Sequence, residues 1–540
     1  MGKTENDAEA ASDAETRSAC AEEIPHDHLY KVTGLSSTKL EKLAEESEPE
    51  AADFEAAISA TGYGKFNILL MLSAFPAFWS SVSVTSSVSY IFTRAKCDMQ
   101  LSLLNMGTIT AITYGGMISS ALLWGFLSDT LGRRRIMIWG FFCSGLVELT
   151  AALSQNFSML LVTRFLAGFL FNGPFAVLLS YIAELHRTEL RARVILYTSL
   201  FYTIAHSTLP LLAWAVLTKA WEFKIYGKFV IHAWNVFLVT TALMPMLSCL
   251  AFAALPESPK FLMSRGRNEE AMAVFKRMYS ENTGNPPDQY PVRKLFAEKT
   301  VELARGVAAL RGGVRQMAPM VRAPHGLWLL LMCLILIGLM FGSNTLRLWF
   351  PQLVAMIGAE DGGSLCTAIA PVNIHPVVPE EVETCKPIET NMMTYLQSVV
   401  VGTGSVLSYG IGGLLVNCCG KKLVAGVCIV ACAAVVIVLP LLGSGSSAVV
   451  GLVTTALALT SLADASLSSI MVDLFPTSMR VMALATFLMS GRMGTIIGTV
   501  AFPALLSFGC FPPFIVISTI LLTCAAACVL IPNTNMKKLE

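Results

Sequence analysis

Charged residues are scarce in this chain. Lys, Arg, Asp and Glu together make up 14% of the 540 residues, against about 25% in a typical soluble domain. Hydrophobic residues make up 54%, so a soluble globular fold and a nucleic-acid-binding protein are both excluded. Most of the 14 cysteines lie inside apolar runs, where cysteine behaves as a small hydrophobic residue. That placement excludes a secreted disulfide scaffold.

Motifs for catalysis and for cofactor binding are also missing from the sequence. It has no Walker loop, no paired zinc motif and no nucleophile elbow. Gly402-x-Gly404 lies in an apolar segment and lacks the strand–helix context of a nucleotide-binding loop. We therefore expect no enzyme activity, no cofactor and no metal site.

The first 60 residues are polar and acidic. They carry 15 Asp and Glu against 5 Lys and Arg, a net charge of −10 in a chain whose total is +1, so the rest carries +11. The pattern of a cleavable signal peptide is missing here, and Asn6 occupies the position where N-myristoylation needs Ser or Thr. Few aromatic residues and many charges predict that residues 1–60 form a mostly disordered tail.

Twelve apolar segments follow this tail. A membrane-spanning helix needs about 20 apolar residues, and the segments of that length are 66–92, 106–124, 136–155, 158–182, 194–217, 232–255, 326–349, 392–416, 424–443, 447–472, 481–507 and 511–531. The long charged link after the sixth segment divides them as six plus six. The pattern predicts an all-α membrane protein with bundles at 61–255 and 326–531, a linker at 256–325 and a tail at 532–540.

The distribution of basic residues predicts the orientation of the chain. Lys and Arg are enriched in cytosolic loops, so we expect both termini in the cytosol, together with Arg133, Arg134, Arg135, Arg187, Arg191, Arg193, Lys421, Lys422 and Arg480. The segment 218–231 departs from this rule, because its three lysines face outward. In the cytosolic linker, a helical repeat of apolar residues predicts an amphipathic helix at the membrane surface, with Ala271, Val274, Phe275 and Met278 on its apolar face.

The segment 351–390 is the longest loop on the outer side, and it contains two cysteines. Because that compartment is oxidising, Cys366 and Cys385 are candidates for a disulfide bond. Cys97 also faces outward and competes with them in this prediction.

Two motifs recur at nearly the same offset in the two halves of the chain. Gly125-Phe-Leu-Ser-Asp-Thr-Leu-Gly-Arg-Arg134 returns 288 residues later as Gly413-Leu-Leu-Val-Asn-Cys-Cys-Gly-Lys-Lys422. Glu184-Leu-His-Arg-Thr-Glu-Leu-Arg191 returns 289 residues later as Asp473-Leu-Phe-Pro-Thr-Ser-Met-Arg480. The agreement predicts two parallel repeats with a site at their interface, which is a transporter architecture.

The segment 125–135 resembles the signature loop of the major facilitator superfamily. The segments 164–168, 181–184, 256–262 and 475–480 resemble its branch of sugar porters and organic-ion transporters. Within that branch, the segments 234–237, 256–271 and 348–351 resemble the synaptic vesicle glycoprotein 2 family. The resemblance implies a major facilitator fold that works by alternating access. It also implies a central cavity faced by spans 1, 4, 5, 7, 8, 10 and 11, and a functional monomer.

The chain departs from that family at several positions. The family has acidic residues in the first span, whereas the segment 75–83 has none, which weakens any proton-coupling role for this helix. Asn235 replaces the usual Arg, and Asn417 replaces the acid of the second signature loop. The outer loop is also too short for the large luminal domain of the synaptic vesicle glycoproteins.

The resemblance assigns the cytosolic loops to a latch that holds the two halves together when the cytosolic side is shut. Asp129 would supply its carboxylate and Gly125 and Gly132 would permit close packing, whereas a basic cluster that only fixes topology is the alternative. The residues expected in the latch are Gly125, Asp129, Gly132, Arg133, Arg134, Glu184, Arg191, Asp473 and Arg480.

Four charged residues lie inside predicted spans, where a charge is costly and is either functional or paired. Glu148 and Arg164 lie eight residues either side of Asn156, and Asp464 and Arg492 lie 13 and 15 residues either side of a second hairpin. At 1.5 Å per residue the members of each pair differ in depth by about 3 Å or less. The spacing predicts two ion pairs, each either structural or part of a substrate and coupling path.

Several uncharged polar residues are further candidates for the substrate path. Arg164, Gly168 and Asn172 share one helix face, and Asn172-Gly-Pro174 interrupts the fourth span, as either a cavity lining or a packing kink. The other candidates, each with packing as the alternative, are Trp79, Tyr114, His206, Asn344 and Tyr395.

The sequence therefore predicts a transporter of a small organic solute, such as an organic ion or metabolite, driven by a solute or proton gradient. Its partners would be the lipid bilayer and that solute, and its location the plasma membrane or an intracellular vesicle. The alternative is a transport-inactive vesicle receptor or regulator on a transporter scaffold. The charges in the spans permit an anion, a cation or a zwitterion.

Overall fold

The structure is a computed structural model, and it describes residues 51–225, 229–296, 320, 322, 325–358, 365–366, 392–442 and 446–532. Within these ranges, twelve helices are at least 19 residues long. Ten of them are long and apolar enough to cross a membrane on the residues described, and α5 and α15 complete the set. This agrees with the expected all-α membrane fold of two six-helix halves.

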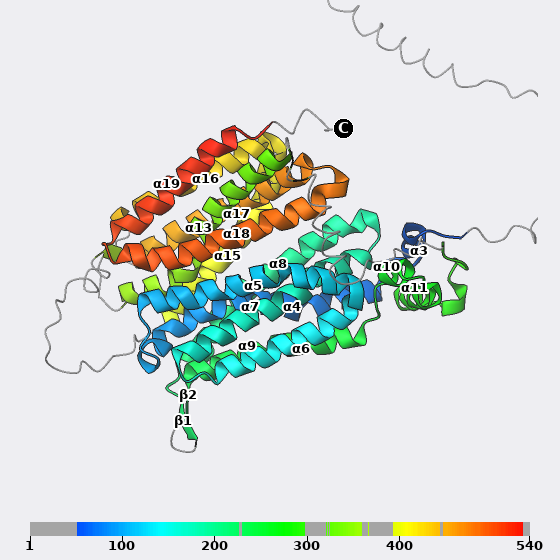
Figure 1. The fold of residues 1–540 in the computed structure, drawn as a ribbon, viewed down its shortest axis with the longest axis horizontal. Coiled ribbons are helices and arrows are strands. Elements are labelled where there is room, and N and C mark those ends of the chain that lie inside the picture. The colour runs from blue at the N-terminus through cyan, green and yellow to red at the C-terminus, as the bar shows by residue number, and fades with distance from the viewer. Residues whose placement is uncertain are drawn as a thin grey trace, which may run out of the picture.

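The long helices form two bundles that lie side by side (Figure 1). The N-terminal bundle contains α4 (Lys65–Asp98), α5 (Leu103–Leu131), α6 (Arg133–Ala152), α7 (Phe157–Glu184), α8 (Thr188–Leu217) and α9 (Ala233–Ala254). The C-terminal bundle contains α13 (His325–Gly358), α15 (Met392–Cys419), α16 (Lys421–Leu442), α17 (Ser446–Leu474), α18 (Thr477–Leu506) and α19 (Phe511–Val529).

Two glycines at equivalent places mark the repeat in the backbone. Gly132 separates α5 from α6 with φ of +93°, and Gly420 separates α15 from α16 with φ of +85°. This left-handed region favours glycine because a Cβ would clash there. The second residue after each glycine is basic and makes the same kind of contact in both halves. Arg134 donates to the Ala253 carbonyl at the end of α9, and Lys422 donates to the Val529 carbonyl at the end of α19.

A short β-hairpin distinguishes one end of the molecule, which we call the hairpin end. Strands β1 (Glu222–Ile225) and β2 (Phe229–His232) pair antiparallel between α8 and α9. Asp98, at the end of α4, lies 3.3 Å from His232 and is therefore at the same end.

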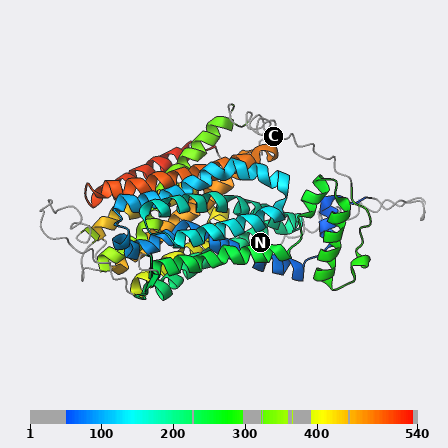
Figure 2. The same ribbon diagram turned by 60° about the horizontal axis from the view of Figure 1, so that its bottom comes forward.

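Short helices gather at the opposite end, which we call the linker end (Figure 2). They are α10 (Pro259–Ser264), α11 (Asn268–Thr283), the 3₁₀ helix η2 (Pro287–Gln289) and α3 (Phe54–Ala60). The predicted apolar face of α11 is buried. It packs on protein, since Phe275 contacts the ring of Phe54 in α3 at a centroid distance of 6.1 Å.

The last ten residues of the predicted tail, 51–60, are ordered in the structure. Asp53 caps α3 by accepting a hydrogen bond from the Ala56 amide, and the Tyr290 hydroxyl donates to the Ala57 carbonyl. Contacts with the linker stabilise residues 51–60, and the amino-acid composition of the tail alone does not predict such contacts. Residues 1–50 lie outside the described part.

Two glycines bring the bundles into close contact on the side of the membrane region nearer the hairpin end. A Cβ on Gly107 of α5 would lie 2.5 Å from the Thr499 carbonyl oxygen of α18. A Cβ on Gly402 of α15 would lie 3.0 Å from the His206 carbonyl oxygen of α8. Both glycines therefore let backbone pack on backbone across the interface, as small residues do between membrane helices.

We predict that Gly107→Val opens this contact. The larger side chain meets a backbone oxygen that cannot rotate away, so overpacking should destabilise this arrangement of the bundles by about 1–3 kcal/mol. The measurement is thermal unfolding of the purified protein in detergent, together with reagent accessibility of a cysteine introduced beside Thr499.

The matched control is Gly115→Val in the same helix, because a Cβ there meets nothing within 4 Å. Equal destabilisation by both variants would mean that helix propensity rather than bundle contact is responsible.

Candidate functional site

A cavity of about 450 Å³ lies between the two bundles, a size typical of small-molecule sites. Helices α4, α5, α7 and α8 line it on one side and α13 and α18 on the other. It reaches towards the linker end, because Leu179 and Thr198, which lie near the linker ends of α7 and α8, are in its lining. The polar residues in its lining are Ser81, Thr85, Ser86, Tyr114, Asn172, Thr198, Tyr202, Thr203, His206, Asn344, Arg347 and Arg492.

A smaller pocket of about 60 Å³ continues from the cavity between α8, α13, α15 and α17. Tyr202, Thr203, His206 and Arg347 belong to both linings. Spans 1, 4, 5, 7, 8, 10 and 11 were expected to face the centre, and each contributes a lining residue. Span 2 joins them through Tyr114 and Met117.

Arg492 connects the two bundles across the cavity. Its Nη1 donates to the Asn172 side-chain oxygen at 2.6 Å, and the Asn172 amide donates to the Met117 carbonyl at 2.9 Å. Asn172 thus lines the cavity, in agreement with the cavity-lining alternative.

The predicted ion pair between Asp464 and Arg492 is wrong, since the described contacts of Arg492 are with Asn172 and the Met489 sulfur. Two side chains at equal depth in the membrane form an ion pair only if the helix faces that carry them point toward each other, and sequence spacing does not determine those faces. Arg347 is the charged side chain whose field acts on Asp464. The Oδ1 atom of Asp464 is buried and has no hydrogen-bond partner within the described residues.

Arg347 lines the cavity although it is not among the charges predicted inside the spans. The predicted span ends at residue 349, which would put this arginine at the membrane surface, but α13 continues to Gly358. Arg347 is therefore inside a long helix and lines the central cavity. The apolar stretch Leu353–Ile357 after Pro351 is the signal that would have extended the span.

The uncharged candidates divide between lining and packing. Tyr114 and Asn344 line the cavity, and the Asn344 amide also donates to the Thr495 hydroxyl at 2.8 Å. Trp79 is buried and donates to the Thr208 hydroxyl, so it joins α4 to α8. Tyr395 is buried in the apolar core.

Glu148 and Arg164 form the predicted ion pair. Arg164 Nη2 lies 2.6 Å from Glu148 Oε2, and both side chains are fully buried between α6 and α7. Neither belongs to the lining of the central cavity. Glu148 Oε1 and two nitrogens of Arg164 have no hydrogen-bond partner among the described residues.

The predicted latch residues of the first half form a network at the linker end. Arg133 lies 3.4 Å from Glu184, whose other oxygen accepts from the Ser258 hydroxyl. The amides of Arg133 and Arg134 both donate to Glu257 Oε1 at 3.0 Å. Glu257, which the sequence analysis did not single out, is the centre of this network.

The two glycines of this loop behave differently. A Cβ on Gly132 would lie 2.6 Å from the Glu257 carboxylate, whereas a Cβ on Gly125 meets nothing within 4 Å. The expected close packing therefore holds for Gly132 and is absent at Gly125 in this arrangement. The side chains of Asp129 and Asn417 lie outside the described part.

The other latch residues also bind partners on their own side. Arg191 binds Glu55 of α3 at 2.6 Å, and Lys421 binds Asp473 at 2.5 Å. Burial raises the pKa of Glu55, but hydrogen bonds from Thr188 and Arg191 outweigh it and hold the pKa below its ordinary value. This carboxylate is therefore charged at neutral pH.

In the second half, the Arg480 amide donates to the Pro476 carbonyl, and its Nε has no hydrogen-bond partner within the described ranges. The ion pairs described at the linker end, Arg133–Glu184, Arg191–Glu55 and Lys421–Asp473, each lie within one half of the chain. The backbone contacts of Gly107 and Gly402 across the interface lie nearer the hairpin end than these ion pairs do.

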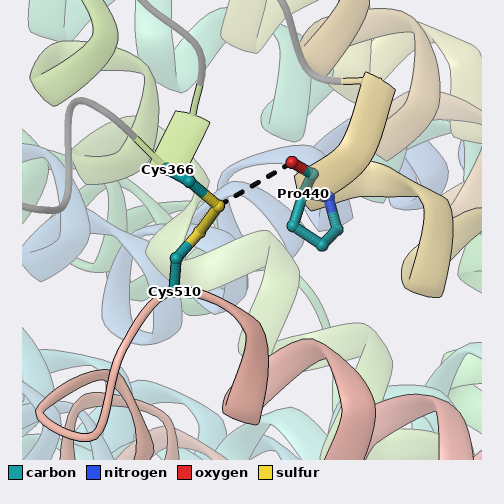
Figure 3. The surroundings of a disulfide bond; sticks show 3 residues. All are labelled: Cys366, Pro440 and Cys510. Carbon is teal, nitrogen blue, oxygen red and sulfur yellow. Dashed lines mark hydrogen bonds between the residues drawn. A yellow bond between two sulfur atoms is a disulfide. The ribbon is translucent and has the colours of Figure 1, made fainter.

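The predicted Cys366–Cys385 disulfide is wrong. Cys366 is bonded to Cys510 in the turn between α18 and α19, with a Cα–Cα distance of 5.3 Å (Figure 3). Cys366 and Cys510 are 144 positions apart in the sequence and meet only in the folded protein. The presence of Cys366 and Cys385 in one loop therefore did not predict the disulfide partner of Cys366. Cys97 is also disulfide-bonded, and Cys385 lies outside the described residues.

The chain matches the family described as "Sugar (and other) transporter" over residues 63–540. The chain belongs to this family. It is a family of transporters rather than enzymes, as the sequence analysis expected.

Curated relatives of the family include the synaptic vesicle glycoproteins. The chain is 26% identical to mouse synaptic vesicle glycoprotein 2C over 341 residues, which cover 59% of this chain and 47% of the relative. It is 24% identical to human synaptic vesicle glycoprotein 2B, covering 62% of this chain and 51% of the relative. The chain thus spans about half the length of the curated relatives it matches.

Solved structures show the same fold. The partially occluded inward-open structure of the xylose transporter XylE from E. coli matches with a TM-score of 0.63 at 14% identity, covering 88% of this chain and all of that one. A D-xylose–proton symporter matches with a TM-score of 0.58. These comparisons confirm the predicted resemblance to a major facilitator transporter near the synaptic vesicle glycoprotein 2 family.

We predict that the buried Glu148–Arg164 pair stabilises the fold only as a pair. Arg164→Met leaves an uncompensated buried carboxylate and should lower the free energy of unfolding by about 3–5 kcal/mol. The double variant Glu148→Leu/Arg164→Met removes both charges and should recover most of that loss. Chemical unfolding of the purified protein in detergent measures both, and a double variant as unstable as the single one contradicts the explanation.

Proposed function

We propose that this protein carries a small organic anion across a membrane by alternating access of the central cavity. The observation that supports this most directly is the charge of the cavity. Arg347 and Arg492 line it, and its lining contains no Asp or Glu among the described residues. A guanidinium group suits a carboxylate because it offers paired donors in a planar fork.

The rest of the lining favours an anion that also has an apolar part. Phe78, Phe171, Phe175 and Met117 provide apolar walls, and Tyr114 provides an aromatic ring with a hydroxyl group. An apolar pocket with a few polar anchors is the usual form of a small-molecule site. The solute proposed is therefore an organic carboxylate or a similar anion rather than an inorganic ion.

The bond between Arg492 and Asn172 supplies a way to couple binding to movement. It joins α18 of one bundle to α7 of the other with a neutral partner for the guanidinium. An anion binds a guanidinium more strongly than an amide oxygen does, so a bound solute would replace Asn172. That exchange would release one bridge between the bundles and favour their rotation.

The linker end is proposed to face the cytosol. Basic residues crowd that end, in line with the enrichment of Lys and Arg in cytosolic loops, and Arg133, Arg191 and Lys421 hold acidic partners there. The described arrangement, with the cavity reaching towards the linker end, would then be the state that takes up or releases solute on the cytosolic side. The membrane would be the plasma membrane or that of an intracellular vesicle.

Asp464 is proposed as the proton-coupling group. It is on α17, within the field of Arg347, and its Oδ1 lacks a hydrogen-bond partner in the described structure. Protonation would remove the negative charge that Arg347 feels, which leaves this arginine freer to bind an anion. A proton and an anion would then bind together and move in the same direction.

Our first test is uptake of labelled organic carboxylates by the purified protein in liposomes. Arg492→Gln and Arg347→Gln should each weaken solute binding by about 10- to 100-fold, since a hydrogen bond to a charged group contributes about 1.5–3 kcal/mol. Arg135→Gln, which removes an exposed charge outside the cavity, should leave uptake unchanged. An unchanged affinity in both cavity variants, or uptake of cations alone, would exclude the anion proposal.

A second test concerns the proton. Asp464→Asn should keep anion binding while uptake loses its dependence on an imposed pH gradient, because the side chain can no longer take up a proton. Asp288→Asn, at an exposed position in η2, is the control for loss of a carboxylate. A pH dependence that survives in Asp464→Asn rules out this residue as the coupling group.

The receptor alternative has its own supporting observation, which is the acid-free first span. The stretch of α4 beside the cavity contributes Ser81, Thr85 and Ser86 as its polar lining residues. If a correctly folded sample transports none of a broad mixture of metabolites and organic ions, the receptor proposal replaces transport. Binding of a soluble protein partner is then the measurement to make.

A further inference from the structure

A second cavity of about 840 Å³ forms a groove between α16 and α19. These two helices lie at the edge of the C-terminal bundle that faces away from the other bundle (Figure 1), so the groove is remote from the central cavity. Its walls are aliphatic and face outward: Leu423, Val427 and Val529 are 58–71% exposed. Lys422, at the linker end, is the one charged residue in the described lining.

The internal repeat shows what is missing beside this groove. In the N-terminal bundle, Glu257 accepts hydrogen bonds from the first two amides of α6 at 3.0 Å and so compensates the positive end of that helix. Glu257 follows α9 in the sequence Leu255-Pro-Glu257. After α19 the matching sequence is Ile531-Pro-Asn533, so a neutral residue stands where the first half has a carboxylate.

Among the described residues, no carboxylate at the start of α16 matches Glu257. Lys421 is paired with Asp473. Lys422 donates to the backbone carbonyls of Val529 and Ile531 at the negative end of the α19 dipole. These two bonds leave the third N–H of its ammonium group available to an anionic oxygen. The positive end of the α16 dipole adds to the charge of Lys422. An apolar groove thus ends at a cationic site at the expected level of the lipid head groups.

We propose that this groove binds one anionic phospholipid. An acyl chain would lie between α16 and α19 along Val427 and Val430, and the phosphate would bind Lys422 and the first turn of α16. The combination fits an anionic amphiphile, because basic pockets between membrane helices on the cytoplasmic side recognise acidic head groups. The site is independent of the solute that the central cavity carries.

The test titrates the purified full chain in detergent with phosphatidylserine or phosphatidylcholine and counts retained lipids by native mass spectrometry. The wild type should retain phosphatidylserine about fivefold more tightly, the preference expected from one lysine near an acidic head group. Lys422→Gln should lose that preference and still bind lipid. Gly426→Phe should block the groove for both lipids, since a Cβ there meets open space and the protein can fold around it.

Two control variants match these changes. Arg135→Gln removes an exposed charge from the equivalent helix of the other bundle, and Gly451→Phe adds the same ring at another open helical position. Both should bind lipid as the wild type does. The proposal fails if Lys422→Gln keeps the head-group preference, or if Gly426→Phe retains lipid.

The same spectra test other occupants of the groove. A dimer that Gly426→Phe disrupts would assign the groove to a second copy of the chain, and an acyl adduct on Cys419, which also lines it, would assign it to a covalent lipid. Either result overturns the proposal of a phospholipid.

Discussion

Backbone-to-backbone contact between the bundles is the constraint on which the rest of the structure depends. Gly107 against the Thr499 carbonyl and Gly402 against the His206 carbonyl leave no room for a side chain at these two crossings. Because close-packed interfaces shift between discrete arrangements rather than deform continuously, these two crossings hold the bundles together in the described arrangement. The space between the bundles is therefore left as a cavity that extends towards the linker end.

The central cavity places two positive charges, Arg347 and Arg492, inside the membrane-spanning region. An unpaired charge is most costly there. Arg347 interacts electrostatically with Asp464. Arg492 donates to the side-chain amide oxygen of Asn172. Neither arrangement gives a guanidinium a close carboxylate of its own in the described structure. Partners of this kind can be replaced by a stronger one, which is what the proposed binding and release of an anion would require.

The two halves of the repeat share the same backbone turn but differ in the charged residues around it. Gly132 and Gly420 keep the same left-handed turn, and each is followed by a basic residue that holds the end of a neighbouring helix. Glu257 compensates the charge of the first copy, whereas Asn533 cannot do so in the second. The two halves thus share the backbone geometry of this turn and differ in the charge of the residue that follows the sixth helix of each half.

The sequence by itself determined the membrane class, the twelve helices and the repeat, because the length of apolar segments and the offset of motifs are properties of the chain. The sequence also predicted the Glu148–Arg164 ion pair. A short hairpin keeps its two helices in contact, so equal depth in the membrane is enough to bring the two side chains together. Only the tertiary structure decided that Arg492 reaches Asn172 and that Cys366 meets Cys510. Those contacts depend on which face of each helix turns inward and on which loops fold together, and neither follows from position along the chain.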